Sequence, residues 1–326
     1  MGLLQRIARV RLAGRTLRRL RRAGVPDARY LSRPFEVRFT APGDSEPTIL
    51  PLAPFLSGDR SLDDLIAELL RVPAVWREAA PMLRPVLRGA APGAPLSRPA
   101  LPFLSEFVVV DQPDTMTYVT PAQSATWRSS PDRIFATARA NLTGAIVQGG
   151  ATTVRFVDDG NAYWTSHLLL PGWLTRLSGQ IGGAPVAFAP ERGTLLVTSD
   201  GSPHLPALFS EAEQLFVRSP HPLSPVAYTS DENGCTVPYP ADPAHRLYRT
   251  VKRAQSLLAI REYAGQGVPL TLVDGWRTRA VWPGDGPVRL PEADEVLIGD
   301  EVVPWADLLP RLTVTDHDPP LWAPRE

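Results

Sequence analysis

Two segments, SPDRIFATARANL (residues 130–142) and PVAFAPERGTLLVTSD (185–200), carry the most regular patterns in the sequence and determine the expected fold class. The first begins with Ser130, a residue type that caps helices, and Pro131, whose missing amide donor costs nothing in a first helical turn. Its apolar residues recur at four-residue spacing, which predicts a helix with one buried face. The second segment contains two apolar runs, which predict a pair of interior strands.

Helical and strand patterns continue on both sides of these segments without regular βαβ spacing. The sequence therefore predicts an α+β fold: a mixed helix and antiparallel-sheet core, an N-terminal basic amphipathic helix and a small C-terminal α+β extension. We expect an N-terminal helix with a hairpin-helix region at 1–100, a central core at 101–240, and a C-terminal helix and hairpin extension at 241–326. The Pro- and Ala-rich segment at 90–102 predicts the first linker, and SLDDLIAELL at 61–70 predicts a helix.

The N-terminal segment concentrates positive charge. The chain has a formal net charge of zero, yet residues 1–26 contain eight arginines and no acid. Apolar residues at helical spacing predict the buried face of an amphipathic helix: Leu3, Ile7, Val10, Leu17 and Leu20. Through residues 1–25 such a helix could bind an anionic membrane surface or nucleic acid, or it could pack as a surface helix with solvated arginines. The candidate binding residues here are Arg15, Arg18, Arg19 and Arg22.

The remaining composition indicates a cytoplasmic protein. No apolar run approaches the roughly 18–20 residues that span a bilayer and no export signal is found, so no transmembrane segment is expected. The single cysteine, Cys235, excludes an internal disulfide and a multi-cysteine zinc site. None of the five histidines is spaced as a metal pair, and no nucleotide-binding motif occurs, so neither a metal nor a cofactor is expected.

One set of residues has the chemical types of a hydrolase site. Ser166 and His167, near the acid pair at 158–159, supply a hydroxyl, an imidazole and a carboxylate, the groups of a nucleophile, base and orienting acid. Loops after strands could add Asp200 and His204. Neighbouring side chains on a helix point about 100° apart, so Ser166 is more simply a helix-start residue and His167 a surface or satisfied buried histidine.

The C-terminal segment combines aromatic residues with arginines. Trp276 and Trp282 alternate with Arg277 and Arg279 across a predicted hairpin, which would give a face that stacks on or binds a partner. Together with Trp305, the tryptophans could instead form the core of the small extension. The sequence leaves both roles open.

Several segments also occur in an order and spacing that resemble a known family. Between residues 30 and 240 they are YLSRPFEVRF, TILPLAPFL, PMLRPVLRG, FLSEFVVVD, TMTYVTPAQ, SPDRIFATARANL, SHLLLPGWL, GAPVAFAPERGTLLV and HPLSPVAY. In this order they resemble the bacterial YtpQ-like family, whose function is not established. The resemblance implies a cytoplasmic α+β protein and brings no known reaction. At 190–193 the chain has Pro-Glu-Arg-Gly where the family pattern has a polar-Asp step, so no role of that Asp is carried over.

The sequence thus predicts a non-catalytic binding or scaffold module that contacts other macromolecules, above all a protein partner, through its two ends. The absence of a convincing catalytic set, together with two ends suited to interaction, motivates this prediction. The alternative is a hydrolase-type enzyme with a site near Ser166, His167, Asp200 and His204.

Overall fold

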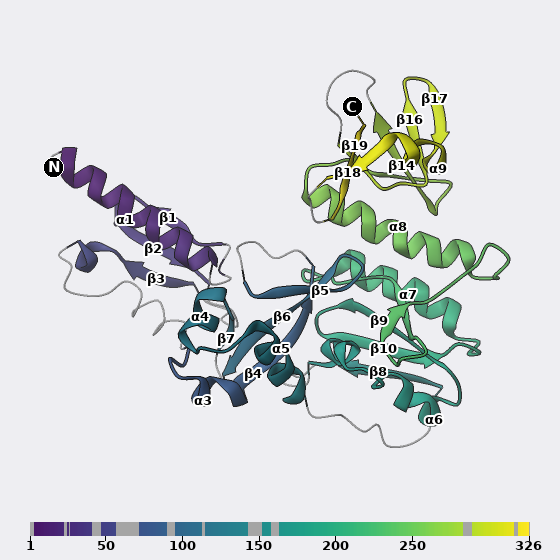
Figure 1. Cartoon of the computed structure of the whole chain (residues 1–326), viewed down its shortest axis with the longest axis horizontal. Helices are drawn as coiled ribbons and strands as arrows, with labels where there is room; N and C mark the ends of the chain where they lie inside the picture. The colour runs from purple at the N-terminus through teal and green to yellow at the C-terminus, as the bar shows by residue number, and fades with distance from the viewer. Residues whose placement is uncertain are drawn as a thin grey trace. The chain divides into compact units, whose positions relative to one another are not determined.

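The computed structural model of the chain divides into two compact units (Figure 1). Unit 1 comprises Met1–Ala100 and Ser105–Gly144, and unit 2 comprises Leu101–Leu104 and Ala145–Glu326. Both contain helices and mostly antiparallel sheets, which confirms the predicted α+β fold.

The structure describes residues 3–22, 25, 27–40, 47–56, 72–89, 95–112, 115–142, 152–157, 163–282, 289–315 and 319–325. The side chains of residues 3–5, 22 and 115 lie outside this description. The helix predicted at 61–70 and the acid pair at 158–159 also lie outside the described residues.

In unit 1, a long N-terminal helix covers one face of a three-stranded antiparallel sheet. The helix is α1 (Leu3–Arg22), and the strands, in spatial order, are β1 (Arg29–Leu31), β2 (Glu36–Phe39) and β3 (Thr48–Pro51). A short 3-10 turn, η1 (Ala53–Phe55), follows. The predicted N-terminal helix is therefore confirmed.

The face that α1 buries includes the predicted Leu20 and, in part, Leu17, but it does not include Ile7 and Val10. Ala13, Thr16 and Leu20 are at most 2 % exposed, whereas Ile7 is 40 % and Val10 is 65 % exposed. Small side chains at two of the buried positions let the helix approach the sheet closely. The Thr16 hydroxyl donates a 2.9 Å hydrogen bond to the carbonyl four residues earlier, so its burial leaves no unpaired group. The prediction was wrong for Ile7 and Val10 because apolar spacing does not reveal which face small residues favour.

The second part of unit 1 is a four-stranded antiparallel sheet with short helices. Its elements are α3 (Trp76–Ala79), η2 (Ala80–Met82), β4 (Leu83–Arg88), β5 (Ser97–Leu101), β6 (Leu104–Gln112), β7 (Thr115–Tyr118), α4 (Pro121–Thr126) and α5 (Pro131–Ala140). Strand β6 pairs with β4, β5 and β7. Ser130 caps α5 by accepting a 3.3 Å hydrogen bond from the Arg133 amide, as the sequence predicted for this helix start.

The linker predicted at 90–102 is wrong over Ser97–Leu101, because these residues form β5. This strand stands at the end of its sheet order. An edge strand can accommodate Pro99, which has no amide hydrogen to donate. The high proline content therefore marked a sheet edge, and residues 90–94 of the predicted linker lie outside the described residues.

A buried carboxylate joins three elements of this sheet. Glu106 on β6 is 0 % exposed and accepts a 2.7 Å hydrogen bond from Arg98 Nε of β5. It accepts two more from Arg139 of α5, at 2.8 Å from Nε and 2.7 Å from Nη2. The Arg98 guanidinium also lies 4.2 Å from the centre of the Phe135 ring. We refer to Arg98, Glu106 and Arg139 as the Glu106 triad.

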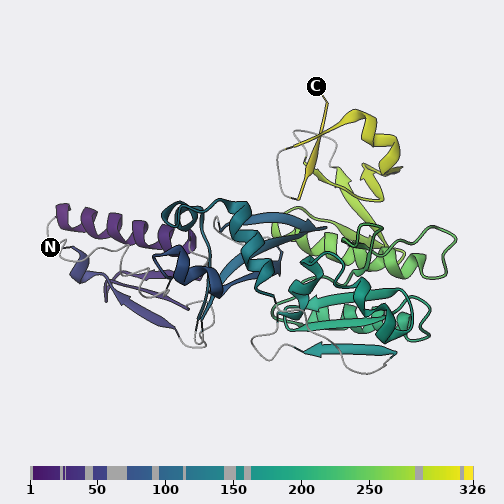
Figure 2. The same ribbon diagram turned by 60° about the horizontal axis from the view of Figure 1, so that its bottom comes forward.

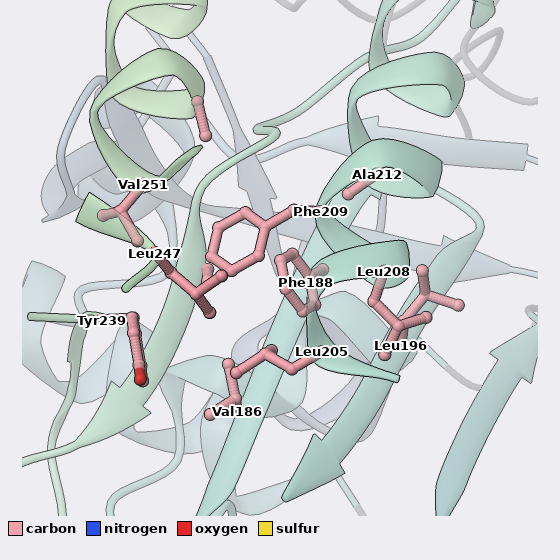
Figure 3. Packing of buried hydrophobic residues seen from close by; sticks show 12 residues of the cluster. Val186, Phe188, Leu196, Leu205, Leu208, Phe209, Ala212, Tyr239, Leu247 and Val251 are labelled. Atoms are coloured by element: carbon pink, nitrogen blue, oxygen red, sulfur yellow. The ribbon is translucent and has the colours of Figure 1, made fainter. Parts of the chain in front are cut away.

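The first layer of unit 2 is a five-stranded antiparallel sheet in the order β12-β11-β9-β10-β8. Its elements are β8 (Thr153–Val157), η3 (Trp164–Leu169), η4 (Thr175–Leu177), α6 (Ser178–Ile181), β9 (Pro185–Glu191), β10 (Thr194–Ser199), α7 (Leu205–Arg218), β11 (Ala227–Ser230) and β12 (Thr236–Pro238). Strands β9 and β10 are interior, as their apolar runs predicted. Helix α7 packs on β9, with Phe188 and Phe209 edge to face at 4.9 Å (Figure 3).

The turn between β11 and β12 approaches another backbone segment closely. Gly234 has a φ of +76°, and a Cβ atom at this position would lie 3.0 Å from the Gly172 nitrogen. The Gly172 amide donates a 2.8 Å hydrogen bond to the Gly234 carbonyl. Both the backbone conformation and the available space therefore require glycine at 234. The next residue, Cys235, is exposed.

The C-terminal part of unit 2 begins with helix α8 (Tyr248–Gly265). The elements after it are β13 (Thr271–Val273), β14 (Arg277–Trp282), β15 (Leu290–Pro291), β16 (Glu295–Ile298), β17 (Glu301–Pro304), α9 (Trp305–Leu308), η5 (Leu309–Arg311), β18 (Leu312–Val314) and β19 (Leu321–Pro324). They form two sheets, β13-β14-β16-β17 and β15-β19-β18. Only β14 and β16 pair in parallel among the described strands.

The two units do not coincide with the three parts expected at 1–100, 101–240 and 241–326. Leu247 and Val251, which follow the expected second boundary, pack in one buried cluster with Val186 and Phe188 of β9 (Figure 3). The start of the expected C-terminal extension is thus part of the core of the central sheet. Apolar packing between distant segments produces this arrangement, and composition along the chain does not reveal it.

Candidate functional site

A shallow depression with a volume of about 280 Å³ lies beside α8 in unit 2. Helix α7 contributes Phe209, Ser210 and Glu213, α8 contributes Arg249, Thr250, Arg253 and Ala254, and the β13–β14 turn contributes Gly275 and Trp276. We call it the α8 depression. It brings one of the predicted binding residues, Trp276, together with cations that the sequence did not single out.

The position of Trp276 follows from a tight hairpin turn. Asp274 and Gly275 both have positive φ angles, 51° and 77°, and the Trp276 amide donates a 3.1 Å hydrogen bond to the Val273 carbonyl. These are the features of a type I′ turn, which an Asp-Gly pair favours. Ser256 of α8 donates a 2.8 Å hydrogen bond to the Trp276 carbonyl, which holds the turn against the helix.

Cations surround the Trp276 ring. The guanidinium carbons of Arg249 and Arg277 lie 5.9 Å and 5.7 Å from the ring centre, within the range of cation–π attraction. Tyr248 meets the same ring edge to face at 5.6 Å. Arg249 is exposed and forms no ion pair with any residue that the structure describes. It is therefore a cation that the depression can offer to a ligand.

Arg253 has a different role, because it is already paired. It donates hydrogen bonds to both carboxylate oxygens of Glu213, at 2.8 Å from Nε and 2.6 Å from Nη2, and another to the Gly275 carbonyl at 2.6 Å. The hydrogen bond to Glu213 raises the pKa of the Arg253 guanidinium above its usual value. This bidentate pair joins α7, α8 and the hairpin turn, and it shapes the wall of the depression.

The predicted binding residues Arg277 and Arg279 are bound internally. Both donate to Glu295 of β16, at 2.7 Å from Arg277 Nη1 and 2.6 Å from Arg279 Nε, and Glu295 is 5 % exposed. Arg277 also pairs with Asp274, and its hydrogen bond holds the pKa of that carboxyl below its usual value. These arginines therefore connect β14 to β16 and the turn.

The tryptophans considered in the sequence, Trp276, Trp282 and Trp305, divide between the two roles that the sequence left open. Trp282 packs against a buried cluster of the C-terminal sheets, and Trp305, 9 % exposed, belongs to that cluster and meets Trp322 at 5.9 Å. Trp276 is outside the cluster and half-buried. Core packing thus accounts for two of the three, and Trp276 is the one that faces a depression.

A second depression of about 250 Å³ lies against α8 in the same unit. Its wall includes Lys252, the single lysine of the chain, which forms a 3.2 Å ion pair with Asp294. Thr278 also donates to Asp294, at 3.0 Å. Burial raises the pKa of Tyr263, another residue of this wall, so the phenol stays protonated at neutral pH. Lys252, Thr278 and Asp294 in this wall are therefore paired with one another.

The four candidate hydrolase residues lie in two different settings. Ser166 and His167 in η3 are 1 % and 2 % exposed, whereas Asp200 and His204 are exposed. The His167 ring lies 5.3 Å from the Trp164 ring and its Nδ1 is 3.2 Å from the Tyr163 carbonyl, an arrangement in which Nδ1 donates. None of the four lines the two depressions beside α8. His167 is thus a buried histidine with a hydrogen-bond partner, which is one of the two structural roles that the sequence suggested for it.

Asp200 has a titratable partner that the sequence did not indicate. The Tyr239 hydroxyl donates a 2.5 Å hydrogen bond to Asp200 Oδ1. Burial, the hydrogen bond and the charge of Asp200 raise the pKa of Tyr239 to about 12. Arg246 opposes this shift weakly, and the His245 ring lies 6.0 Å from the phenol ring. Tyr239 is therefore a protonated donor at neutral pH.

This shift predicts a pH-dependent stability. Because the pKa of Tyr239 is about 12 in the folded chain and 10.0 without its surroundings, its contribution is complete below pH 10 and is lost between pH 10 and 12. The difference in unfolding free energy between the wild type and Tyr239→Phe should fall by about 2 to 3 kcal/mol across that range. Urea unfolding at several alkaline pH values measures it, and the other tyrosines cancel in the difference. A difference that stays constant up to pH 12 would contradict the assignment.

The N-terminal candidates lie on α1. Arg15 and Arg18 are exposed, Arg19 is half-buried, and the side chain of Arg22 lies outside the described residues. No three His, Cys, Asp or Glu side chains of the described residues are grouped as metal ligands. No described helix has the length and apolar character needed to cross a membrane.

No family model, curated protein or solved structure matches this chain. The resemblance to the YtpQ-like family over residues 30–240 therefore stays a prediction. The local site also contains residues that the sequence reading missed, namely Glu213, Arg249 and Arg253. The four-residue spacing of Arg249 and Arg253 on a predicted helix was the available signal, since it places both on one face. Nothing in the sequence pairs Glu213 with Arg253.

Proposed function

We propose that the protein is a non-catalytic binding module of the cytoplasm that contacts a protein partner through the α8 depression. The observation that carries the proposal is an exposed cation beside an aromatic face, Arg249 next to Trp276. The resemblance to the YtpQ-like family is compatible with this proposal, since that family brings no known reaction.

The chemistry of the depression favours an acidic side chain next to an apolar or aromatic one. A guanidinium group binds a carboxylate through two parallel hydrogen bonds, and an indole face offers a large rigid contact area. The Arg253–Glu213 pair is already satisfied, so it shapes the wall and leaves Arg249 as the group for an incoming carboxylate. A volume of about 280 Å³ fits a few side chains of a peptide and is small for a large cofactor.

The expected result is that a glutamate-rich peptide with one aromatic residue binds and changes the fluorescence of Trp276. Arg249→Gln should weaken binding about tenfold, because a hydrogen bond to a charged group contributes about 1.5 kcal/mol or more. Fluorescence titration of the full chain measures the affinity, and Trp276→Phe should remove most of the signal change.

Arg218→Gln is the matched control, because Arg218 is an exposed arginine of unit 2 that lies outside the depression. It should bind the peptide as the wild type does. Equal weakening by Arg218→Gln and Arg249→Gln would indicate non-specific charge attraction and would overturn the proposal. Equal binding of a peptide with glutamine in place of glutamate would overturn it as well.

The hydrolase-type alternative retains one supporting observation, the contact between Asp200 and Tyr239. The single hydroxyl hydrogen of Tyr239 is donated to Asp200, so the Asp200 carboxylate is the group that would accept a proton from an attacking water. Ester hydrolysis by the full chain, abolished by Asp200→Asn and by Tyr239→Phe, would support this alternative. Activity that survives both substitutions would place any reaction elsewhere.

A further inference from the structure

We propose that α1 binds the surface of an anionic lipid bilayer, with Ile7 and Val10 entering the headgroup region and arginines of the same face contacting lipid phosphates and carboxylates. This inference goes beyond the proposed function. It rests on unit 1, and the α8 depression plays no part in it.

The first observation is an apolar pair on the outer side of the helix. The sheet-facing side chains Ala13, Thr16 and Leu20 recur at spacings of three and four, and they are buried. Ile7 and Val10, in the turns before Ala13, are instead 40 % and 65 % exposed. In Figures 1 and 2, α1 lies along β1–β3, and no described element of unit 1 covers its outer side.

The second observation is the charge around this pair. Arg11 and Arg18 are four and eleven positions after Ile7, which places them on the same side of the helix. Arg6, Arg11, Arg18 and Arg21 are exposed and form no ion pair with any residue that the structure describes. Residues 1–26 contain no acid that could neutralise them. The face is therefore complementary to a surface that carries negative charge.

The combination favours lipid over nucleic acid. An amphipathic helix on a membrane gains free energy from apolar side chains inserted below the headgroups and from basic side chains at their level. A nucleic acid would use the arginines alone, and it would leave Ile7 and Val10 in water. No aromatic residue among residues 1–26 offers a base a stacking surface.

Flotation of the full chain with vesicles tests the proposal. We expect binding to phosphatidylcholine vesicles that contain about 30 % phosphatidylserine, and little binding to phosphatidylcholine alone. Arg11→Gln should lower the partition coefficient about fivefold, which corresponds to the ~1 kcal/mol that a basic residue contributes near an anionic surface. Ile7→Ser with Val10→Ser should lower it about tenfold through lost apolar burial. These side chains are exposed, so circular dichroism should show an unchanged fold.

The controls lie at the end of α7 in unit 2. Val217 has the same exposed fraction as Val10, 65 %, and the exposed Arg218 follows it. Val217→Ser and Arg218→Gln should leave vesicle binding unchanged.

Equal binding to uncharged vesicles, or equal loss from the α7 variants, would overturn the proposal. The chain could instead bind a DNA or RNA duplex and fail to bind vesicles. If that binding requires Arg11 but is unchanged by Ile7→Ser with Val10→Ser, the ligand of α1 is a nucleic acid and the lipid proposal is overturned. Peptide binding at the α8 depression should not change in the α1 variants.

Discussion

Replacing Glu106 by glutamine is expected to lower the free energy of unfolding of unit 1 by about 3 kcal/mol. Glu106 is 0 % exposed and holds Arg98 and Arg139 through three hydrogen bonds. Removing its charge leaves two guanidinium groups facing each other across a neutral amide. Both arginine side chains are about one-third exposed, so water can hydrate part of their charge, which keeps the expected loss at the lower end of the range for buried pairs. Urea unfolding of the full chain measures the loss.

Two further variants test whether the loss comes from the buried charge of Glu106. Glu36→Gln disrupts the 3.5 Å pair with the half-exposed Arg38 and should change stability by less than about 1 kcal/mol. Replacing the whole triad with Arg98→Met, Glu106→Leu and Arg139→Met should restore most of the stability, because no charge then stays buried without a partner. If Glu106→Gln is no more destabilising than Glu36→Gln, the triad does not hold the sheet together as we describe.

Phe188→Ala is expected to destabilise unit 2 by about 3 to 5 kcal/mol, through lost burial and the cavity left behind. Phe188 is 0 % exposed and lies in the cluster that β9, β10, β11, α7 and α8 share (Figure 3). The surrounding side chains come from these five elements, so the space cannot close without moving a helix or a strand. Thermal or urea unfolding measures the change.

The control is Val217→Ala on the outer side of α7, where the side chain is 65 % exposed and the change should stay within about 0.5 kcal/mol. A double-mutant cycle of Phe188→Ala with Phe209→Ala should show a coupling of about 0.5 to 1.5 kcal/mol for the edge-to-face pair. A loss of less than about 1 kcal/mol from Phe188→Ala would contradict the packing described for this core.

Local patterns in the sequence predicted the elements whose formation depends on neighbouring residues. Ser130 and Pro131 predicted the start of α5, and the apolar runs at 185–200 predicted the interior strands β9 and β10. The N-terminal helix is also local in origin. The prediction failed for Ile7 and Val10 of its buried face, because which side chains are buried depends on how the helix packs on the sheet of β1, β2 and β3.

The candidate site depends on pairings between distant residues, so the sequence indicated only part of it. Trp276 could be singled out because an aromatic residue beside arginines follows an Asp-Gly turn. Its cationic neighbour Arg249 lies on a helix 27 positions earlier, and Glu213, which fixes Arg253, lies 40 positions before its partner. For Arg277 and Arg279 the sequence predicted too much. Their charge suggested a surface available to a partner, but both donate hydrogen bonds to Glu295.

The turn at Gly234 places a site for chemical labelling in the wild-type chain. A label on the exposed thiol of Cys235 would sit next to a backbone contact that fixes the turn, and the chain offers no other thiol to react. A maleimide dye therefore attaches to the wild-type sequence at one defined place in unit 2. Its anisotropy would follow the tumbling of that unit when peptide or vesicles are added, without any engineered cysteine.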